Sequence, residues 1–227
     1  MKPAKRTPGA APRNADTTDH SPLPRHGSYS RADSADAYRL HYCDWGRADN
    51  PQVVVCVHGY HRSARDFDDL ARDLSTQFRV ICPDLAGRGN GDWLGTAAEH
   101  DFPQLLADLD ELLFGLEIEE VDWIGASLGA ILGMHLAVQP GTSIRRLVMK
   151  NIGEGVPLEP SRQPGTPLSA PLAGAHSVDL WKRIKCPTVL LRSDTPAVSQ
   201  CEAGTIRRFL MQDVKAPREE SHACVAA

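Results

Sequence analysis

Along this chain, runs of mostly apolar residues alternate with segments whose apolar residues are spaced as in a helix. This pattern indicates that strands and helices alternate. Mostly apolar runs, rich in β-branched residues, occupy 52–59, 78–89 and 121–125, and each of them ends at a glycine. Runs of this kind are typical of strands that are covered on both faces, as in a parallel sheet. Three further segments are predicted as strands, the first of them an outer strand because it alternates apolar and polar residues: 37–46, 144–153 and 187–194.

Helical spacing appears between these runs. The segments with that spacing are 66–74, 101–118 and 128–139. The leucines of 101–118 share one stripe, as in an amphipathic helix, whereas 128–139 is apolar on most sides and is predicted to be buried. Strands and helices therefore alternate, which predicts an α/β fold with a mostly parallel sheet and helices on both faces.

Two segments show neither the apolar runs of strands nor the spacing of helices. Residues 1–35 are rich in Pro, Ser, Asp, Arg and Ala and hold almost no large apolar side chains, so we predict a disordered tail. Residues 36–227 are then expected to form one domain. Within that domain, residues 154–177 are rich in Pro, Gly and Ser and are predicted to be a loop.

Composition and charge indicate which kinds of partner and which cellular compartment to expect. The 25 basic and 29 acidic residues give a formal charge of −4, so we expect no nucleic-acid partner. No apolar run approaches the roughly 18 residues of a membrane span, and the first residues lack the apolar core of a secretory signal. The six cysteines show no C-x-x-C spacing and are predicted to be reduced thiols of a cytoplasmic protein. The oligomeric state stays open.

One pentapeptide carries candidate chemistry. Gly125, Ser127 and Gly129 form G-x-S-x-G where a short strand turns at once into a helix. Such a turn bends the chain sharply at the serine, lifts its hydroxyl off the sheet, and leaves no room for side chains two residues before or after. The alternative is a helix N-cap serine between packing glycines.

Two backbone N–H groups are predicted to donate hydrogen bonds to an oxyanion formed next to Ser127. The Leu128 N–H begins a helix and is therefore unpaired and electropositive. A second donor is expected in the loop after the strand at 53–57, where Tyr60 follows His58 and Gly59. We expect His58 to orient this loop through hydrogen bonds. Four residues are candidates for substrate binding: His58, Gly59, His61 and Trp93.

Three motifs together resemble the α/β-hydrolase superfamily. They are His58-Gly59, the glycine-rich segment that runs from Asp84 through Gly87 and Gly89, and the Ser127 elbow, in the order that family shows. The resemblance covers about residues 37–153 and, more weakly, 179–194. It looks closest to esterase-like and C–C hydrolase-like members.

The family's order of nucleophile, acid and histidine implies the rest of a triad. Asp194 ends a predicted strand and His222 is the downstream histidine, so they are assigned as the acid and the general base. The alternatives are a turn aspartate and a solvated histidine. Asp213 ranks second as the acid, and a family variant that carries the acid one strand earlier points to the region of Asn151 and Glu154.

The sequence departs from the family in two places. Residues 154–177 stand where relatives insert a helical cap, so the cap is expected to be reduced or absent. The chain ends five residues after His222, which predicts a shortened C-terminus.

The resemblance implies a serine hydrolase that cleaves small carboxylic esters through an acyl-enzyme, without a cofactor. Lactone, amide or C–C substrates on the same triad, or a degenerate ligand-binding protein on the same fold, are the alternatives. His41, His100 and His135 show no ligand spacing, so no metal is predicted.

Overall fold

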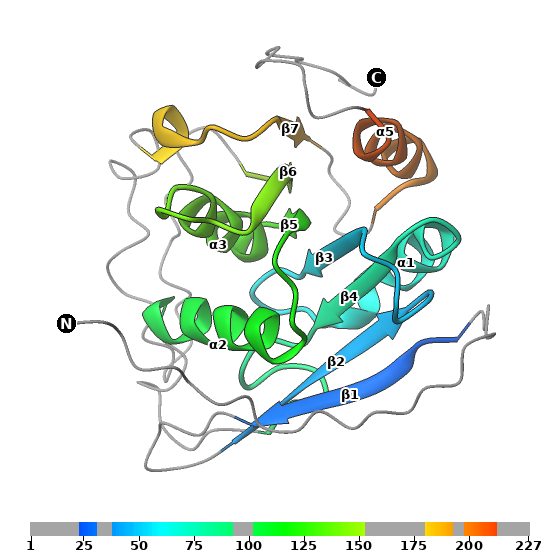
Figure 1. Cartoon of the computed structure of the whole chain (residues 1–227), viewed down its shortest axis with the longest axis vertical. Helices are drawn as coiled ribbons and strands as arrows, with labels where there is room; N and C mark the ends of the chain where they lie inside the picture. Colours follow the sequence, from blue (N-terminus) through cyan, green and yellow to red (C-terminus); the bar gives the residue numbers. More distant parts are fainter. Residues whose placement is uncertain (1–22, 31–37, 93–101, 153–179, 193–197, 213–227) are drawn as a thin grey trace.

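A computed structural model describes residues 23–30, 38–92, 102–152, 180–192 and 198–212 (Figure 1). They form a seven-stranded sheet in the order β1-β2-β4-β3-β5-β6-β7. The strands are β1 (Arg25–Ser30), β2 (Arg39–Trp45), β3 (Val53–Val57), β4 (Arg79–Pro83), β5 (Val121–Ala126), β6 (Ile144–Lys150) and β7 (Thr188–Leu191). The helices are η1 (Ala64–Phe67), α1 (Asp68–Leu74), α2 (Phe102–Gly115), α3 (Leu128–Ala137) and α5 (Gln200–Leu210).

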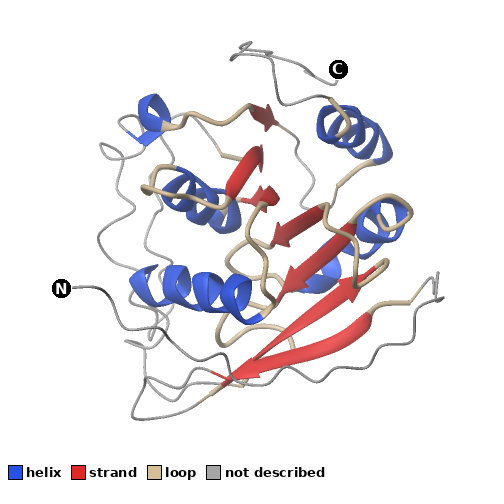
Figure 2. Cartoon of the chain, in the orientation of Figure 1, coloured by secondary structure: helices blue, strands red, loops and turns tan. Residues whose placement is uncertain are grey.

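Strands β4, β3, β5, β6 and β7 pair in parallel, and β2 joins β4 antiparallel. All five residues of β3 are buried, as expected for a central strand covered on both sides. The predicted α/β class and mostly parallel sheet are confirmed (Figure 2).

Helices cover both faces of the sheet, and each face has its own apolar core. Alternate residues along a strand point to opposite faces. Val55 and Val57 face α2 and α3 in one cluster, whereas Val54 and Cys56 face α1 and α5 in the other. Figure 1 shows α2 and α3 on one side of the sheet and α1 and α5 on the other.

Strand β1 corrects the prediction of a disordered tail for residues 25–30. It pairs antiparallel with β2 at the edge of the sheet, with Arg25 opposite Asp44. Backbone pairing and an Arg25–Asp44 ion pair of 2.9 Å hold it there, so it needs few apolar side chains of its own. The ring of Tyr42 lies across Gly27, where a Cβ would come within 2.1 Å of that ring.

Helix α5 follows a stretch in which the sequence shows little apolar periodicity. Ser199 and Glu202 form a capping box: the Ser199 side chain accepts from the Glu202 N–H and the Glu202 carboxylate accepts from the Ser199 N–H at 2.7 Å. Glu202 also pairs with the buried Lys150 at 2.5 Å, which ties the helix to the end of β6. Local capping and one buried ion pair thus define a helix that the hydrophobic pattern leaves indistinct.

Candidate active site

Ser127 sits at a sharp turn between β5 and α3. Its backbone has φ 50° and ψ −111°, a strained conformation for a residue with a side chain. Its N–H donates to the Lys150 carbonyl at 2.9 Å, so the turn is held against β6. Its side chain makes no capping hydrogen bond to α3, which removes the main support for the N-cap interpretation.

The two glycines of the elbow are sterically required. A Cβ on Gly125 would lie 2.4 Å from the Ala130 nitrogen, and a Cβ on Gly129 would lie 2.0 Å from the Val57 carbonyl oxygen. Both obstructing groups are backbone atoms, which cannot swing away as a side chain can. The expected reason for the two glycines is confirmed.

The loop after β3 lies directly against the elbow. A Cβ built on Gly59 would be 3.5 Å from the Ser127 Cβ, so the two backbones are in near contact. Leu128, the first residue of α3, is buried beside them, and its N–H has no acceptor within the helix. The structure therefore brings Gly59, Tyr60, Ser127 and Leu128 into one region.

His58 fixes the conformation of this loop. Its ring is fully buried, with Nδ1 donating to the Gly59 carbonyl at 2.7 Å and Nε2 accepting from the Leu85 N–H at 3.0 Å. Both ring nitrogens are therefore engaged within the protein, and the ring positions the loop instead of presenting a nitrogen to a ligand. Burial lowers the pKa of His58, in keeping with a neutral ring.

The Gly59–Tyr60 peptide is oriented by these contacts. The Gly59 carbonyl also accepts from the Arg62 N–H at 3.2 Å. Because C=O and N–H point in opposite directions across a trans peptide, the Tyr60 N–H is directed away from the His58 ring. This is the orientation that leaves the Tyr60 N–H available as a donor.

Arg88 holds the other side of Tyr60. Its Nε donates to the Tyr60 carbonyl at 2.5 Å and its Nη1 to the Ala86 carbonyl at 2.7 Å. The guanidinium carbon also lies 4.6 Å from the centre of the Tyr60 ring. Burial lowers the pKa of Arg88. Sequence reasoning missed this residue, although it lies in the glycine-rich segment after β4.

Asp84 organises that glycine-rich segment. Its buried carboxylate accepts from the Ala64 N–H at 2.7 Å and from the Asn90 N–H at 3.0 Å. Gly89 has φ 57°, and a Cβ there would lie 2.0 Å from the Asp84 Oδ1. The carboxylate can thus approach the loop backbone only because residue 89 has no side chain.

The remaining predicted residues are placed unevenly. His61 is exposed, with its ring edge against Tyr60 at 4.5 Å between ring centroids. Asp194, His222 and Trp93 lie outside the described residues, as do Asp213, Glu154 and segment 154–177. Asn151 is described, just after β6, with φ 57°. The triad assignment therefore remains a prediction.

A cavity of about 270 Å³ lies beside the amino ends of the parallel strands, at the end of the sheet opposite to Ser127. It is lined by residues that precede β3 and β4, that begin β6 and that end α5, among them Gln52, Gln77, Arg146 and Met211. Ligands of open α/β sheets bind beyond the carboxyl ends of the strands, where Ser127 lies. This cavity is therefore separate from the candidate active site.

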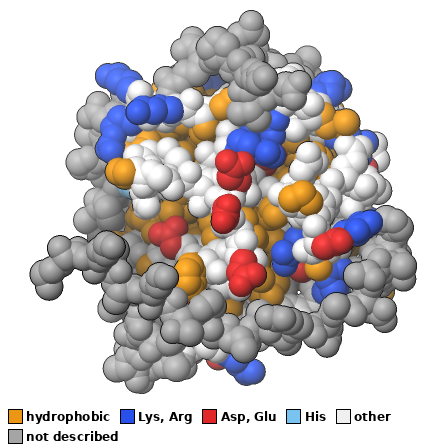
Figure 3. Space-filling view, viewed as in Figure 1, with side chains coloured by type: hydrophobic (Ala, Val, Ile, Leu, Met, Phe, Trp, Pro, Cys, Tyr) orange, Lys and Arg blue, Asp and Glu red, His pale blue; other side chains and the backbone are white. Residues whose placement is uncertain are grey.

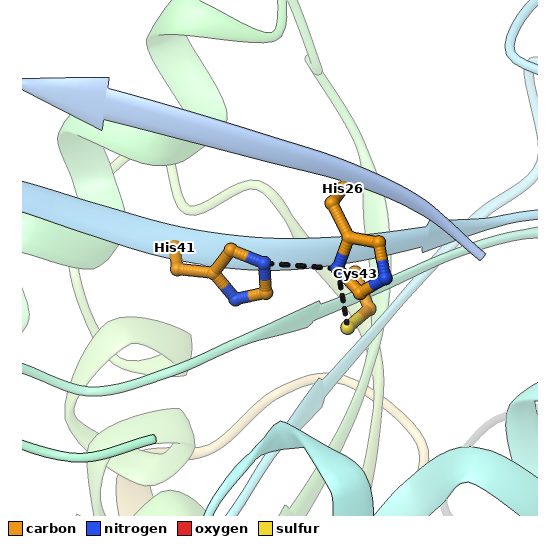
Figure 4. Close-up of side chains that lie close together, drawn as sticks. All are labelled: His26, His41 and Cys43. Atoms are coloured by element: carbon orange, nitrogen blue, oxygen red, sulfur yellow. Dashed lines mark hydrogen bonds between the residues drawn. The ribbon is translucent and has the colours of Figure 1, made fainter. Parts of the chain in front are cut away.

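Three side chains of types that can bind a metal lie close together on strands β1 and β2. His26 of β1 lies opposite Cys43 of β2, and His41 precedes Cys43 by two residues on the same face. Their ligand atoms all lie within 4.8 Å of one another (Figure 4). The prediction of no metal rests on sequence spacing and does not take in His26, because the hydrophobic pattern does not reveal the strand that carries it.

Figure 3 shows apolar, acidic and basic side chains on one face of the described residues. On this face basic side chains gather at the upper left, and several acidic side chains lie near the centre. Across the ranges that the structure describes, no helix is long and apolar enough to cross a membrane.

The fold and the elbow together define an α/β hydrolase. The chain belongs to the alpha/beta hydrolase fold family, because a model of that family matches residues 52–176, more than half of the chain.

Particular relatives include a 3-hydroxybutyrate-oligomer hydrolase of Cupriavidus necator. It is 41% identical over 133 residues, which is 59% of this chain and 45% of the relative. The crystal structure of an alpha/beta hydrolase from Novosphingobium aromaticivorans has 35% identity and a TM-score of 0.52, over 58% of this chain and 45% of that one. A thioesterase domain from the curacin biosynthetic pathway has 25% identity and a TM-score of 0.50, over 55% and 46%. This chain thus spans about half the length of the proteins it matches.

Proposed function

We propose that this chain is a serine hydrolase that cleaves short-chain carboxylic esters through an acyl-enzyme, with Ser127 as the nucleophile. The observation that carries the proposal is the conformation of Ser127, at φ 50° between two glycines that tolerate no Cβ. Strained backbone conformations of this kind are found mainly at functional residues, where the surrounding structure holds them in place. The half-buried Ser127 side chain, which does not cap the helix, supports the same conclusion.

The proposed reaction has two halves. Ser127 Oγ attacks the ester carbonyl while His222 takes its proton, and Asp194 stabilises the resulting imidazolium. The negative oxygen of the tetrahedral intermediate accepts from the Tyr60 and Leu128 N–H groups. The C–O bond to the alcohol then breaks, and the alcohol leaves with the proton from His222. Water, activated by His222, releases the acid and regenerates Ser127.

The proposed substrate class is an ester of a short hydroxy acid. A 3-hydroxybutyrate oligomer, named for the Cupriavidus necator relative, is a chain of esters of a four-carbon acid. That size agrees with the prediction that residues 154–177 form a reduced cap, since a cap supplies the apolar walls that long acyl chains need. Lactones, amides and C–C bonds, and thioesters as in the curacin domain, remain alternative substrates for the same residues.

A fluorophosphonate probe tests the nucleophile directly. We expect one labelled site on the wild type, located at Ser127 by peptide mass spectrometry, and no labelling of Ser127→Ala. Ser75→Ala is the matched control, because among the described residues its hydroxyl donates to the Arg72 carbonyl of α1, and its labelling should match the wild type. A wild type that unfolds cooperatively but takes no label would contradict the proposal and favour a ligand-binding protein.

Ester turnover tests the remaining assignments. Hydrolysis of a 3-hydroxybutyrate dimer should be lost in Ser127→Ala and in His222→Gln, each by at least about 10⁴-fold in kcat. Asp194→Asn should also lower kcat, whereas retained activity in that variant would move the acid to Asp213 or to the end of β6.

A further inference from the structure

We propose that His26, His41 and Cys43 bind a zinc ion that fastens strand β1 to the rest of the sheet. The three side chains lie on one face of the β1–β2 hairpin, the face that packs toward η1 and α1 (Figure 4). The proposal does not depend on the activity of Ser127.

The spacing of the ligand atoms suits a tetrahedral ion. His26 Nδ1 lies 3.0 Å from His41 Nε2 and 3.8 Å from Cys43 Sγ. Around one zinc ion, with bonds of about 2.0–2.1 Å to nitrogen and 2.3 Å to sulfur, ligand atoms are separated by roughly 3.3–3.6 Å. These two separations lie within a few tenths of an ångström of that range, and the ligand atoms of His41 and Cys43 lie within 4.8 Å of each other.

The ring of His41 is already oriented as a ligand. Its Nδ1 contacts the Asp84 carboxylate at 3.0 Å, and the carboxylate can only accept, so Nδ1 carries the proton. The lone pair is then on Nε2, the atom that faces His26. Metal-bound histidines in proteins almost always donate their second nitrogen in this way, and the carboxylate also offsets the charge of the cation.

Charged groups of η1 and α1 complete the surroundings. Arg65 pairs with Asp68 at 2.6 Å through Oδ2, whereas Asp68 Oδ1 is buried without a hydrogen-bond partner among the described residues. The Asp68 carboxylate acts electrostatically on both Cys43 and His26. Burial, with smaller contributions from Asp84 and Asp68, raises the pKa of the Cys43 thiol to about 11, so a bound zinc ion must displace the thiol proton.

Zinc is the metal that this donor set favours. Two imidazoles and one thiolate are borderline-soft ligands, which suit zinc and exclude the oxygen-preferring calcium and magnesium ions. Binding is balanced by loss of the Cys43 thiol proton to the solvent, while His26 moves its ring proton from Nδ1 to Nε2. The exposed His26 ring leaves a path for entry of the ion.

The test measures zinc binding to the full chain, freed of metal with a chelator and kept reduced. We expect one zinc ion per chain in competition with a chromogenic chelator. His26→Gln and Cys43→Ser should each weaken affinity by at least about 100-fold, since loss of a group that only supports a ligand already costs 10–100-fold. His26 is exposed, so its variant should stay folded. Cys201→Ser is the matched control, because Cys201 is an exposed thiol on α5.

Two further readouts separate this site from adventitious binding. Cobalt in place of zinc should show a thiolate-to-metal charge-transfer band that disappears in Cys43→Ser. Zinc should also slow amide hydrogen exchange in residues 25–30 of the wild type. Equal zinc affinity of the wild type and His26→Gln, a cobalt spectrum without the charge-transfer band, or unchanged exchange in 25–30 would each overturn the proposal.

Discussion

Gly129→Ala should both destabilise this protein and distort its candidate active site. The new Cβ would lie 2.0 Å from the Val57 carbonyl oxygen, 2.6 Å from the Val57 carbonyl carbon and 2.9 Å from the His58 carbonyl oxygen. Ordinary contact needs about 3.5 Å, so α3 and the end of β3 must separate by more than about 1 Å. Neither element can yield easily, because β3 is the buried centre of the sheet and α3 is apolar and buried.

The magnitude follows from overpacking in a rigid core. Inserted carbons of this kind cost about 1–3 kcal/mol, and contacts that are all with backbone put this one near the upper value. For a chain of this size, about 3 kcal/mol lowers the melting temperature by roughly 6–12 °C. A shift of about 1 Å in the Leu128 N–H should also lower esterase kcat/KM by about 100-fold.

The assay pairs urea and thermal unfolding with ester hydrolysis, and Gly204→Ala serves as the control. Gly204 lies inside α5, where a Cβ meets only the tip of Arg208 at 3.7 Å. The same substitution should there stabilise the protein, by up to about 1 kcal/mol, through helix propensity. If Gly129→Ala melts at the wild-type temperature, the close approach of α3 to the end of β3 is wrong.

Three further predictions follow from the loops and the pocket. Arg88→Gln removes the guanidinium that holds the Tyr60 carbonyl, so esterase kcat/KM should fall by about 10-fold with little change in melting temperature; unchanged kinetics would show that the bond does not position Tyr60. Burial lowers the pKa of His58, so the unfolded chain binds its proton first, and the free energy of unfolding should fall as pH drops below about 6.5, by up to about 1.4 kcal/mol per pH unit. A His58→Gln variant should lose that part of the slope, and an unaltered slope in urea titrations would contradict it. Among p-nitrophenyl esters, kcat/KM should stop rising beyond about C4 to C6, because each added methylene gains its roughly fourfold factor only where it is buried; a steady rise to C10 would show that residues 154–177 close over the site.

Much of the fold could be predicted because buried strands and helices consist largely of apolar residues. The parallel strands β3, β4 and β5 and the buried helix α3 each begin within one residue of the predicted segment, although β4 ends at Pro83, six residues before its predicted end. The elbow was predictable for a different reason. The steric demand at Gly125 and Gly129 is local in sequence, so the two glycines report it directly.

Features held by polar contacts were harder to foresee. Helix α5 has a mixed surface, and its clearest signal is the spacing of Ser199 and Glu202, which a search for capping boxes would have found. The role of Arg88 depends on a bond to the Tyr60 carbonyl across 28 residues, and no local pattern encodes that contact.

The edge hairpin shows what a hydrophobic pattern leaves out, namely register. His41 and Cys43 share a face because they are two residues apart, but His26 joins them only if it stands opposite Cys43. A slip of one residue would turn His26 to the other face and dissolve the cluster. The register is held by the Arg25–Asp44 ion pair on that other face, reinforced by Arg79 at 3.0 Å from Asp44. Polar residues that resemble an unstructured tail in the sequence therefore form the edge strand β1 and contribute to the candidate zinc site.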